Sequence, residues 1–484
     1  MSSARVTATT LAGLIGSLAG ERPVYRALAD RLRLLIVDGR VLAGTRLPSE
    51  RDLTSSLGVS RTTVTSAYAV LRESGYVRAR HGSGTIADLP SGTIRRGTGV
   101  SLFPAEVGDE VIDLTCAATR APLGVAEAYA AGLADLPAYL AGAGYLTLGV
   151  PELRRVIADR YTARGLPTSP DEILVTSGAV AAMAVASRAF VRPGDRVLLE
   201  TPTYPNTVES LRRIGARLSA IPVHSTGWDI DGYRSALRSL SPKAAVLIPD
   251  FHNPTGAFMP EEQRAELGSA LQRHGAVTLI DETIAEVRLD GAITAAPFAA
   301  HHPGAITIGS ASKSHWGGLR LGWLRARADL LARLLGARVT IDLGAPVLEQ
   351  LVLLHLMRQT PGLAPERAAE LTAARDTAVG AVRARLPHVD FVVPHGGLSL
   401  WLHLRTGSAS RIVEAAEREG LLLAGGNRFA VTGTLDRCLR LPYVLAPDQL
   451  SEAVARLARA VTAAEHTAYG PVTGQHRSGG PLVA

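Results

Sequence analysis

The stretch Ile306–Trp323 reads ITIGSASKSHWGGLRLGW, an apolar run followed by serines, a lysine, a glycine pair and an arginine. The chain has 51 Lys+Arg residues, yet only Lys243 and Lys313 are lysines, so a retained lysine needs a role that arginine cannot fill. A lysine amine can lose its proton and attack an aldehyde, whereas a guanidinium cannot. Neighbouring hydroxyl and guanidinium groups suit a phosphate. The stretch therefore predicts pyridoxal 5′-phosphate held as a Schiff base on Lys313. The alternative, a surface lysine that follows a strand, fits Lys243 better.

The composition is that of a globular protein with more than one domain. At 484 residues, 46% of them hydrophobic and 20% charged, the chain exceeds a single ordinary core. Its two cysteines, Cys116 and Cys438, are far apart and offer neither a disulfide framework nor metal-ligand spacing. The first residues lack a signal-peptide pattern, and no stretch approaches a long uncharged apolar span. We therefore expect a cytoplasmic protein with no metal site and no contact with a membrane.

Most of the excess positive charge lies near the amino terminus. Residues 1–90 carry twelve arginines against seven acidic residues, an excess of five within a formal net charge of +7. A basic segment of this kind favours an anionic polymer as its partner. A merely solvated basic face would have the same composition, so charge alone does not decide between them.

The same region shows helical patterns and a hairpin. A short apolar helix is expected at 8–18, and a stronger one over Pro23–Gly39 has apolar residues on one face. Ser49 and Ser60 can each cap a further helix, and the tight link between these two helices is typical of a helix-turn-helix. The run 76–86 predicts a hairpin with a basic, glycine-containing tip, which is a wing able to lie against phosphate.

Three motifs occur here in order, namely LPSERDL at 47–53, LGVSRTTV at 57–64 and HGSGT at 81–85. Together they resemble the winged helix of GntR-type regulators, over roughly residues 21–88. The resemblance implies binding to double-stranded operator DNA, with the third helix entering the major groove. The residues that it places at the DNA are Arg46, Arg51, Arg61, Thr62, Thr63, His81 and Gly82.

From residue 111 onward, apolar strand-like runs alternate with helical ones. This alternation predicts an α/β layer with a largely parallel sheet, whose sites lie at the carboxyl ends of the strands. The clearest strands are at 173–176, 197–200, 245–248, 277–280 and 305–308. Asn253 and Asp281 follow two of them, and a carboxylate at Asp281 could keep a pyridine nitrogen protonated. A helix cap is the competing role for Asp281, and an Asn-Pro turn without a ligand is the competing role for Asn253.

The order of the motifs after these strands resembles fold-type I aminotransferases, over about residues 111–466. The motifs are Tyr145, SGA at 177–179, Tyr204-Pro205, NPTG at 253–256, Asp281-Glu282, SASK at 310–313 and GLRLG at 318–322. The resemblance implies a large α/β cofactor domain and a smaller carboxyl-terminal α+β domain from about residue 350. It also implies that Lys313 and Asp281 are the catalytic pair. The other cofactor contacts that it implies are Gly178, Ala179, Val180, Tyr204, Asn253, Thr283, Ser310, Ser312, Arg320 and, across a dimer interface, Tyr145.

By this resemblance, Tyr204 stacks on the cofactor ring and Asn253 meets the ring oxygen, while Arg440 clamps a ligand carboxylate. Two features depart from the family pattern. Relatives usually carry a tyrosine two residues after the aspartate to bond the ring oxygen, but here that position is Thr283, whose hydroxyl has a shorter reach. Val180 offers the phosphate only its backbone N–H. The first departure leaves transamination in question.

A GntR-type winged helix joined to an aminotransferase-like domain resembles the MocR-type regulators. This implies a head-to-tail homodimer and a pyridoxal-phosphate-dependent transcriptional regulator that senses the cofactor or an amino compound through aldimine chemistry at Lys313. One alternative is an active aminotransferase that carries a DNA-binding domain. Another, a regulator without cofactor, is disfavoured by the intact cofactor residues. The expected segments are a leading helix or arm at 1–20, the winged helix at 21–88, a linker at 89–110, the aminotransferase-like domain at 111–466 and a disordered tail at 467–484.

Overall fold

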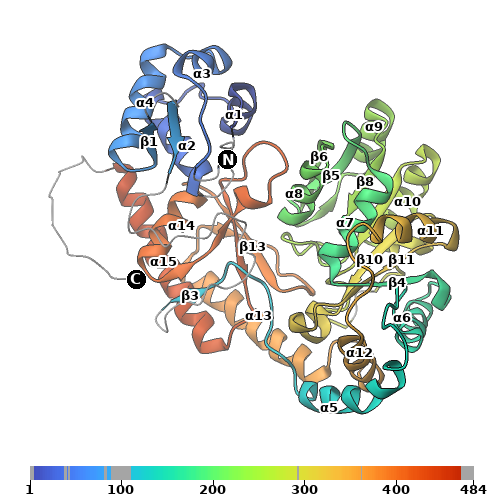
Figure 1. Cartoon of the computed structure of the whole chain (residues 1–484). Coiled ribbons are helices and arrows are strands. Elements are labelled where there is room, and N and C mark those ends of the chain that lie inside the picture. The colour runs from blue at the N-terminus through green and yellow to red at the C-terminus, as the bar shows by residue number, and fades with distance from the viewer. Residues whose placement is uncertain are drawn as a thin grey trace. The chain divides into compact units, whose positions relative to one another are not determined.

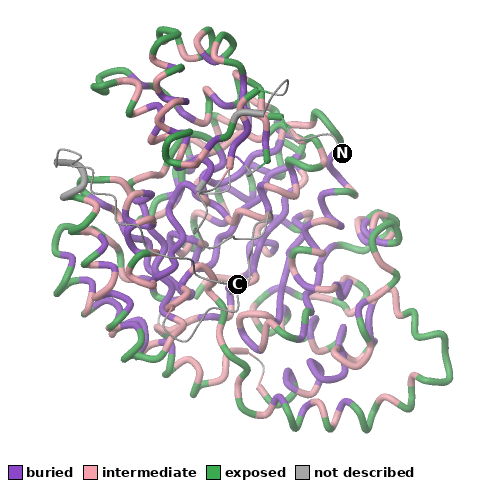
Figure 2. The backbone as a smooth tube through the Cα atoms, turned by 60° about the vertical axis from the view of Figure 1, so that its left-hand side comes forward, coloured by how far each residue is buried: buried purple, intermediate pink, exposed green. Residues whose placement is uncertain are grey.

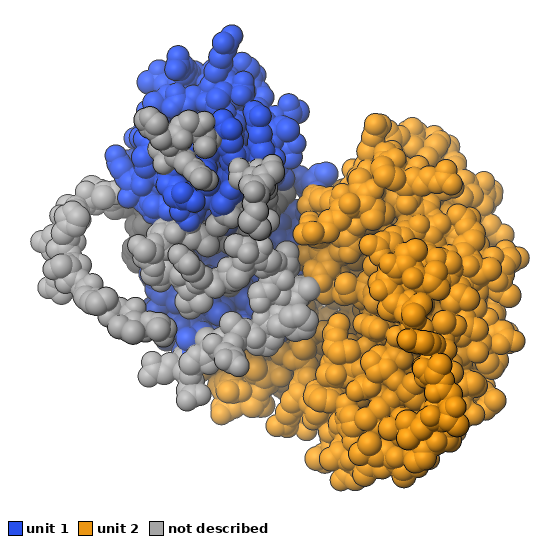
Figure 3. Space-filling model, viewed as in Figure 1, with its two compact units in different colours: residues 1–116, 404–439, 455–484 blue, residues 117–403, 440–454 orange. Residues whose placement is uncertain are grey.

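A computed structural model describes residues 5–37, 41, 44–80, 84–88, 111–291, 294–360 and 362–469. The chain divides into two units (Figure 3). Unit 1 comprises Met1–Cys116, Leu404–Leu439 and Ala455–Ala484, and unit 2 comprises Ala117–His403 and Arg440–Val454. The predicted linker at 89–110 and most of the predicted tail lie outside the described residues.

The amino-terminal part of unit 1 is a helical domain with a two-stranded wing (Figure 1). Its elements are α1 (Ala8–Ile15), α2 (Val24–Val37), α3 (Glu50–Leu57), α4 (Arg61–Glu73), β1 (Val77–Arg80) and β2 (Gly84–Ala87). The two predicted caps are confirmed, because the Ser49 hydroxyl accepts from the backbone of Asp52 at 3.2 Å and that of Ser60 accepts from Thr63 at 3.1 Å. Gly58, with φ +65°, ends α3 in the left-handed conformation and allows the tight turn into α4.

This domain has a hydrophobic core of its own. The buried cluster includes Leu28, Leu32, Leu53, Val64 and Tyr68, and among the described residues its members all come from positions 11–87. The helix-turn-helix therefore does not borrow apolar residues from the rest of unit 1.

The remainder of unit 1 comes from the carboxyl-terminal half of the chain. It contains α14 (Ala409–Arg418), β14 (Leu421–Leu422), β15 (Ala424–Gly425) and the last part of α15 (Pro447–Tyr469). Beyond residue 110 the chain joins it through β3 (Ile112–Asp113), which pairs with β14 in parallel. Helix α15 runs to Tyr469 and so enters the segment predicted to be a disordered tail.

Unit 2 is built on an eight-stranded sheet of order β4-β11-β10-β9-β8-β5-β6-β7. The strands are β4 (Ile173–Thr176), β5 (Arg196–Thr201), β6 (Arg217–His224), β7 (Gly227–Trp228), β8 (Ala244–Leu247), β9 (Val277–Asp281), β10 (Ile306–Ser310) and β11 (Gly322–Arg325). Strands β5, β6, β8, β9 and β10 are parallel, and β11 is antiparallel to both of its neighbours. The predicted, largely parallel sheet is thus present, with each predicted strand placed to within two residues.

Helices cover the sheet and bury it. They are α5 (Val125–Asp135), α6 (Pro151–Ala163), α7 (Ala179–Phe190), α8 (Pro205–Arg213), α9 (Ile230–Leu240), α10 (Glu261–His274), α11 (Ala328–Arg338) and α12 (Val347–Gln359), with α13 (Pro365–Arg385) following in the chain. Every residue of β4, β8 and β10 is buried, as expected of strands covered on both faces, and buried positions run through the interior in Figure 2. A second, four-stranded sheet has the order β12-β13-β16-β15, with β12 (Val389–Asp390), β13 (Ser399–Leu404) and β16 (Cys438–Pro442). In the part of the chain that the structure describes, no helix has the length and apolar character to span a membrane.

Candidate cofactor and DNA-binding sites

The residues predicted to bind a cofactor lie where strands of the large sheet end. Asp281 is the last residue of β9 and Ser310 the last of β10. Lys313 follows in a short π-helical turn, a distortion that is frequent at functional sites. Because neighbouring parallel strands end at the same edge of a sheet, this arrangement brings the polar residues to one side of unit 2.

One corner of the site is shaped to hold a phosphate. Gly178 caps α7 with φ +97°, so the first-turn N–H groups of α7, from Ala179 and Val180, are presented at a helix N-terminus. An ideal Cβ on Gly178 would lie 3.5 Å from Nη2 of Arg320, which places this guanidinium beside the start of the helix. A Cβ on Gly322 would come within 2.8 Å of the Ala179 nitrogen, so only glycine allows β11 to pass this close.

The loop after β10 forms the rest of this corner. The Ser310 hydroxyl accepts the Ser312 N–H at 3.1 Å and lies 3.4 Å from the Leu321 carbonyl, which folds the serine-rich turn toward the start of β11. Arg320 has a left-handed backbone, with φ +52°, and its side chain is exposed. A cationic group and helix N–H donors that face the same opening are the donor set that a phosphate monoester requires.

Asp281 supplies a buried carboxylate. Its Oδ1 accepts the Thr283 backbone N–H at 2.9 Å, and the residue is 7% exposed. Burial raises the pKa of Asp281, while the backbone and side-chain hydrogen bonds of Thr283 act against that rise. Thr283 therefore holds the aspartate in place, and its contact with the ring oxygen stays a prediction. A buried carboxylate of this kind is stabilised by a cationic partner, and a protonated pyridine nitrogen is such a partner.

A second buried carboxylate, which sequence reasoning missed, lies beneath this region. Glu200 is fully buried near the end of β5 and accepts hydrogen bonds from Trp228 Nε1 at 2.6 Å and from the Ile248 backbone at 2.8 Å. His252 Nε2 lies 3.3 Å from Glu200 Oε2. Among the charges that act on Asp281, Glu200 raises its pKa and His252 lowers it. A glutamate at the end of an apolar strand was the only available sequence signal.

His252 has a second contact on its other ring nitrogen. Its Nδ1 is 3.0 Å from the Thr255 hydroxyl, whose oxygen also accepts the Ala257 N–H at 3.3 Å. This chain of contacts fixes the loop immediately before Asn253.

The Asn253 loop brings the predicted effector residue to the cofactor residues. The Asn253–Pro254 bond is cis, and Asn253 Oδ1 lies 3.4 Å from Arg440 Nη1. Arg264, fully buried, holds the start of this loop through Asp250 at 2.8 Å. Arg440 is itself 6% exposed. The structure thus places the predicted carboxylate clamp beside the residue predicted to meet the ring oxygen.

Three further residues predicted to bind the cofactor differ in their surroundings. Lys313 Nζ donates to the Ala117 carbonyl at 2.6 Å and the residue is half-buried, so its amine is held within unit 2. The Tyr204 hydroxyl accepts from Asn206 at 3.1 Å. Tyr145 is 68% exposed, and no described contact brings it to the other cofactor residues of this chain.

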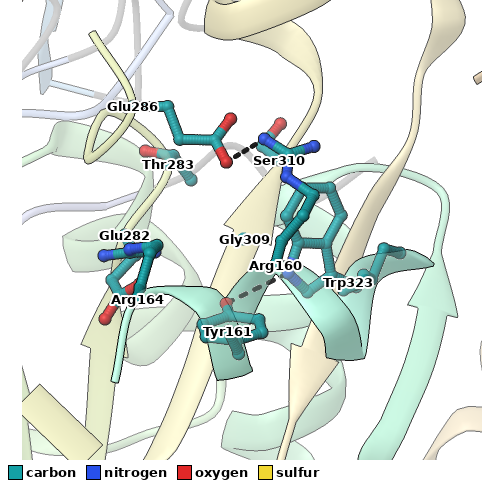
Figure 4. A pocket seen from close by; sticks show the side chains of 10 residues that line it. Arg160, Tyr161, Arg164, Glu282, Thr283, Glu286, Gly309, Ser310 and Trp323 are labelled. Atoms are coloured by element: carbon teal, nitrogen blue, oxygen red, sulfur yellow. Dashed lines mark hydrogen bonds and ion pairs between the residues drawn. The ribbon is translucent and has the colours of Figure 1, made fainter. Parts of the chain in front are cut away.

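A small recess, partly open to solvent, adjoins the cofactor residues (Figure 4). Its lining includes Thr283 and Ser310, which it shares with the site above. On its other side, Arg160 pairs with Glu286, and Arg164 pairs with Glu282 at 2.9 Å. Burial tends to raise the pKa of Glu286, but Arg160 and other neighbouring donors bring it below its ordinary value. Sequence reasoning did not identify Arg160, Arg164 and Glu286 as lining residues, because their ion pairs join segments more than a hundred positions apart.

The predicted DNA-binding residues are largely accessible. Arg51 and Thr62 are exposed, and the Arg61 side chain is 78% exposed at the start of α4. The Thr63 hydroxyl lies 2.8 Å from that of Ser60, so it helps to cap the helix. Arg46 is half-buried beside the wing, where a Cβ on Gly84 would meet its guanidinium at 3.5 Å. His81 and Gly82 lie outside the described residues.

Comparison with known proteins identifies two families in the chain. The family described as "Aminotransferase class I and II" matches residues 141–457, and "Bacterial regulatory proteins, gntR family" matches residues 24–86. The chain is 30% identical over 323 residues to a 2-aminoadipate transaminase of Thermus thermophilus, covering 65% of this chain and 80% of that protein. It is 28% identical over 480 residues to the HTH-type transcriptional regulator TauR of Rhodobacter capsulatus, covering 90% and 96%. It is 29% identical over 326 residues to the probable rhizopine catabolism regulatory protein MocR of Rhizobium meliloti, covering 62% and 65%.

The fold is also found in solved structures. Thermus thermophilus LysN, an α-aminoadipate aminotransferase complexed with N-(5′-phosphopyridoxyl)-L-leucine, aligns with a TM-score of 0.68 and 27% identity, covering 76% of this chain and 96% of that one. The helix N-terminus, the buried aspartate and the lysine described above fit pyridoxal 5′-phosphate, the cofactor of this fold. The chain belongs to the aminotransferase class I and II family and carries a gntR-family DNA-binding domain in front of it, which makes it a MocR-type, pyridoxal-phosphate-dependent transcriptional regulator.

Proposed function

We propose that this regulator responds to a small amino compound that also carries a carboxylate or a sulfonate. The observation behind the proposal is the position of Arg440, whose Nη1 lies 3.4 Å from Asn253 Oδ1 at the edge of the cofactor residues. A largely buried guanidinium beside a reactive centre is suited to a bidentate anion. An effector with an amine at one end and an anion at the other would engage Lys313 chemistry and Arg440 together.

Each residue has a task in this proposal. Bound pyridoxal phosphate supplies an aldehyde that reacts reversibly with primary amines. Lys313 would provide the resident amine for this aldehyde. Asp281 would hold a proton on the ring nitrogen, and Arg320 with the start of α7 would hold the phosphate. Arg440 orients the effector through its anionic end.

Regulation would follow from linkage between the two sites. An effector that binds more tightly to one arrangement of the protein shifts the population toward that arrangement, and DNA affinity changes by the same coupling free energy. Typical couplings of about 1–3 kcal/mol change affinity about 5- to 150-fold. The DNA is double-stranded operator DNA, and we propose the cytoplasm as the place of action because the chromosome lies there.

We further propose a head-to-tail homodimer. Tyr145, Ile341 and Leu343 are exposed apolar side chains at 68%, 36% and 48%, and Gly344 packs against the backbone of Leu146, so the two segments are adjacent. An exposed apolar area of this kind supports association with a second copy. In such a dimer Tyr145 would reach the cofactor phosphate of the partner copy.

The proposal is tested by titrating purified, cofactor-loaded protein with candidate amino carboxylates and amino sulfonates. We expect a change in the absorbance of the bound cofactor and a parallel change in operator affinity measured by gel retardation. Arg440→Met should weaken the response about 10- to 150-fold, since one charged hydrogen bond contributes about 1.5–3 kcal/mol. Arg385→Met, an exposed arginine at the end of α13, is the matched control. Equal responses of both variants would contradict the role of Arg440.

An active aminotransferase remains the second candidate, and one observation favours it. The phosphate corner, the buried Asp281 and the presence of Lys313 support it, and the transaminase of Thermus thermophilus is among the relatives. Multiple turnover of an amino acid with a keto acid at about 1–1000 s⁻¹ would establish it. A single half-reaction without turnover would support the sensing role.

A further inference from the structure

The loop that carries Tyr145 is exposed on one side of this residue and fixed on the other. Residues 141–145 are exposed, whereas residues 146–150 pass from half-buried to buried. Tyr145, at 68% exposure, is the last residue of the exposed part. A tight turn follows it, in which the Gly149 N–H donates to the Leu146 carbonyl at 2.9 Å. The direction of the Tyr145 side chain is therefore set by whatever holds the segment after it.

A buried arginine holds the first part of that segment. Arg338, the last residue of α11, is 1% exposed. Its Nη1 donates to the Thr147 carbonyl at 2.7 Å and also to the Val175 carbonyl of β4. Its Nε donates to Asp342 Oδ1 at 2.7 Å, and the same oxygen accepts the Gly344 N–H at 3.1 Å. One guanidinium thus joins the loop, the sheet and the end of α11, which the point charge of a lysine cannot do.

A buried glutamine holds the second part. Gln350 is fully buried in α12, and its Oε1 accepts the Val150 N–H at 2.7 Å, while its Nε2 donates to a backbone carbonyl just before α12 at 2.9 Å. The Val175 N–H donates to the Leu148 carbonyl at 3.0 Å. Gly149 has φ +103°, and a Cβ there would lie 2.5 Å from the Val175 side chain and 2.9 Å from Gln350 Oε1. Only glycine lets the chain pass this close to its supports.

This arrangement holds an exposed aromatic residue on a rigid backbone. A buried guanidinium is unfavourable unless hydrogen bonds compensate it, and those of Arg338 go to backbone carbonyls and to Asp342. A loop that is already ordered loses less conformational entropy when its side chains bind a partner. The support behind residues 146–150 therefore suits a tyrosine that must meet its binding partner in one fixed direction.

We propose that Arg338 is a positioning residue for Tyr145, supported by Gln350, and that it acts on the cofactor phosphate of the partner copy. The inference rests on the proposed homodimer, in which Tyr145 reaches that phosphate. The Arg338 guanidinium lies behind the loop, bonded to the Thr147 and Val175 carbonyls. Its influence on cofactor binding is therefore expected through Tyr145 alone, and only for a ligand that carries the phosphate.

A double-mutant cycle tests whether Arg338 acts through Tyr145. The measured quantity is the dissociation constant for pyridoxal divided by that for pyridoxal 5′-phosphate, from absorbance titrations of cofactor-free protein. Tyr145→Phe removes the hydroxyl and should lower this ratio about 10- to 150-fold. Arg338→Lys keeps the charge but loses the fork, and should lower the ratio by more than about threefold, beyond the scatter of such cycles. The double variant should match Tyr145→Phe within about twofold.

Arg325 provides a matched control for the loss of a buried guanidinium. It is 4% exposed and pairs with Glu172 at 3.2 Å. It ends β11, whose first residue, Gly322, passes the start of α7, so Arg325 lies at the edge of the sheet opposite the cofactor residues. Arg325→Lys should lower the melting temperature, as Arg338→Lys does, but leave the ratio of the two dissociation constants unchanged. An equal fall of the ratio in both variants would reduce Arg338 to a structural role and overturn the proposal.

Mixed dimers test the action on the partner copy. One chain carries Lys313→Ala and cannot join the cofactor covalently, and the other carries Arg338→Lys. The two are co-expressed and purified through two different affinity tags. The intact Tyr145 and Arg338 of the first chain then serve the site of the second. We expect the absorbance of cofactor joined to Lys313 to appear at the same pyridoxal 5′-phosphate concentration as in the wild-type protein. Its appearance only at the higher concentration that Arg338→Lys alone requires would place the effect within one copy and overturn the proposal.

The outcomes separate this inference from the proposal beneath it. An unchanged ratio in Tyr145→Phe would refute the role of Tyr145 at the phosphate, and with it this inference. A fall in Tyr145→Phe with an unchanged ratio in Arg338→Lys, or a further fall in the double variant, would overturn the role of Arg338 alone. Circular dichroism establishes that each variant is folded. If Arg338→Lys does not fold, Asp342→Ala replaces it with the same expectations, because Asp342 is the partly exposed partner of Arg338 Nε.

Discussion

Replacing Arg320 with methionine should separate recognition of the cofactor phosphate from recognition of the ring. The guanidinium lies beside the N-terminus of α7, with Nη2 3.5 Å from the position of a Cβ on Gly178. Both arginine and methionine have a Cβ and an unbranched stem, so the left-handed backbone at this position, φ +52°, is equally demanding for both. The change therefore removes the charge and the donors without adding backbone strain.

The magnitude follows from the contacts that are lost. A hydrogen bond to a charged group contributes about 1.5–3 kcal/mol, so the dissociation constant for pyridoxal 5′-phosphate should rise about 10- to 150-fold. Pyridoxal, which lacks the phosphate, makes no use of this guanidinium. Its dissociation constant should change by less than about threefold, which corresponds to roughly 0.6 kcal/mol.

The assay is absorbance titration of cofactor-free protein with the two aldehydes in turn. Arg327→Met is the matched control, since Arg327 is 55% exposed and pairs only with Asp329 at 3.0 Å among the described contacts. That variant should bind both compounds as the wild-type protein does. An equal loss of affinity for both aldehydes in Arg320→Met would show that the residue supports the fold of the site, and the assignment to phosphate would be refuted.

Three further predictions concern buried groups in unit 2. Asp250→Asn leaves the fully buried Arg264 without its counter-charge, which should cost about 3–5 kcal/mol and lower the melting temperature by roughly 10 °C in scanning calorimetry. Gly309→Ala would place a Cβ 2.2 Å from the Trp323 ring, so overpacking of about 1–3 kcal/mol should lower the urea midpoint. Burial and the positive charge of Arg160 lower the pKa of His315 from 6.5 to about 4. Between pH 6.5 and 4 the unfolded chain therefore binds a proton at this histidine, whereas the folded chain does not. Stability should therefore fall by up to about 1.4 kcal/mol per unit as pH drops from about 6.5 toward 4, and His315→Gln should flatten that slope.

Each of these predictions has a control or a contrary result. Asp231→Asn removes a carboxylate that is 90% exposed and should leave the melting temperature within about 1 °C, as expected of a surface pair. Gly336→Ala, on α11 with nothing within 4 Å of its Cβ, should not lower the urea midpoint. A wild-type pH slope that persists unchanged in His315→Gln would assign the acid sensitivity to other groups.

The sequence predicts elements well where the signal is local. Ser49 and Ser60 cap their helices as expected because a hydroxyl three residues before a free N–H needs no distant partner. The strands of the large sheet are found to within two residues because each is a short apolar run, covered on both faces. The order of motifs after those strands led to Asp281 and Arg320, which lie at the end of β9 and beside the start of α7, while their roles toward the cofactor stay predictions.

What escapes the sequence depends on segments that meet only in the folded chain. Glu200 and His252 form a buried pair, yet neither stands out in its own segment. The backbone N–H of Thr283 donates to Asp281, two positions before it, a contact that the sequence pattern does not specify. The hydrogen bonds from Arg338 and Gln350 to the segment after Tyr145 join positions 191 and 200 residues apart, and no local pattern specifies them.

The self-sufficient core of the DNA-binding domain has an evolutionary consequence. Among the described residues its apolar interior is complete within positions 11–87, so recombination can attach such a domain to an existing catalytic fold without leaving a hole in either. Coupling between the DNA-binding domain and the catalytic fold can then arise through substitution of a few charged surface residues. A metabolic enzyme would become a genetic switch with its ancestral pocket intact.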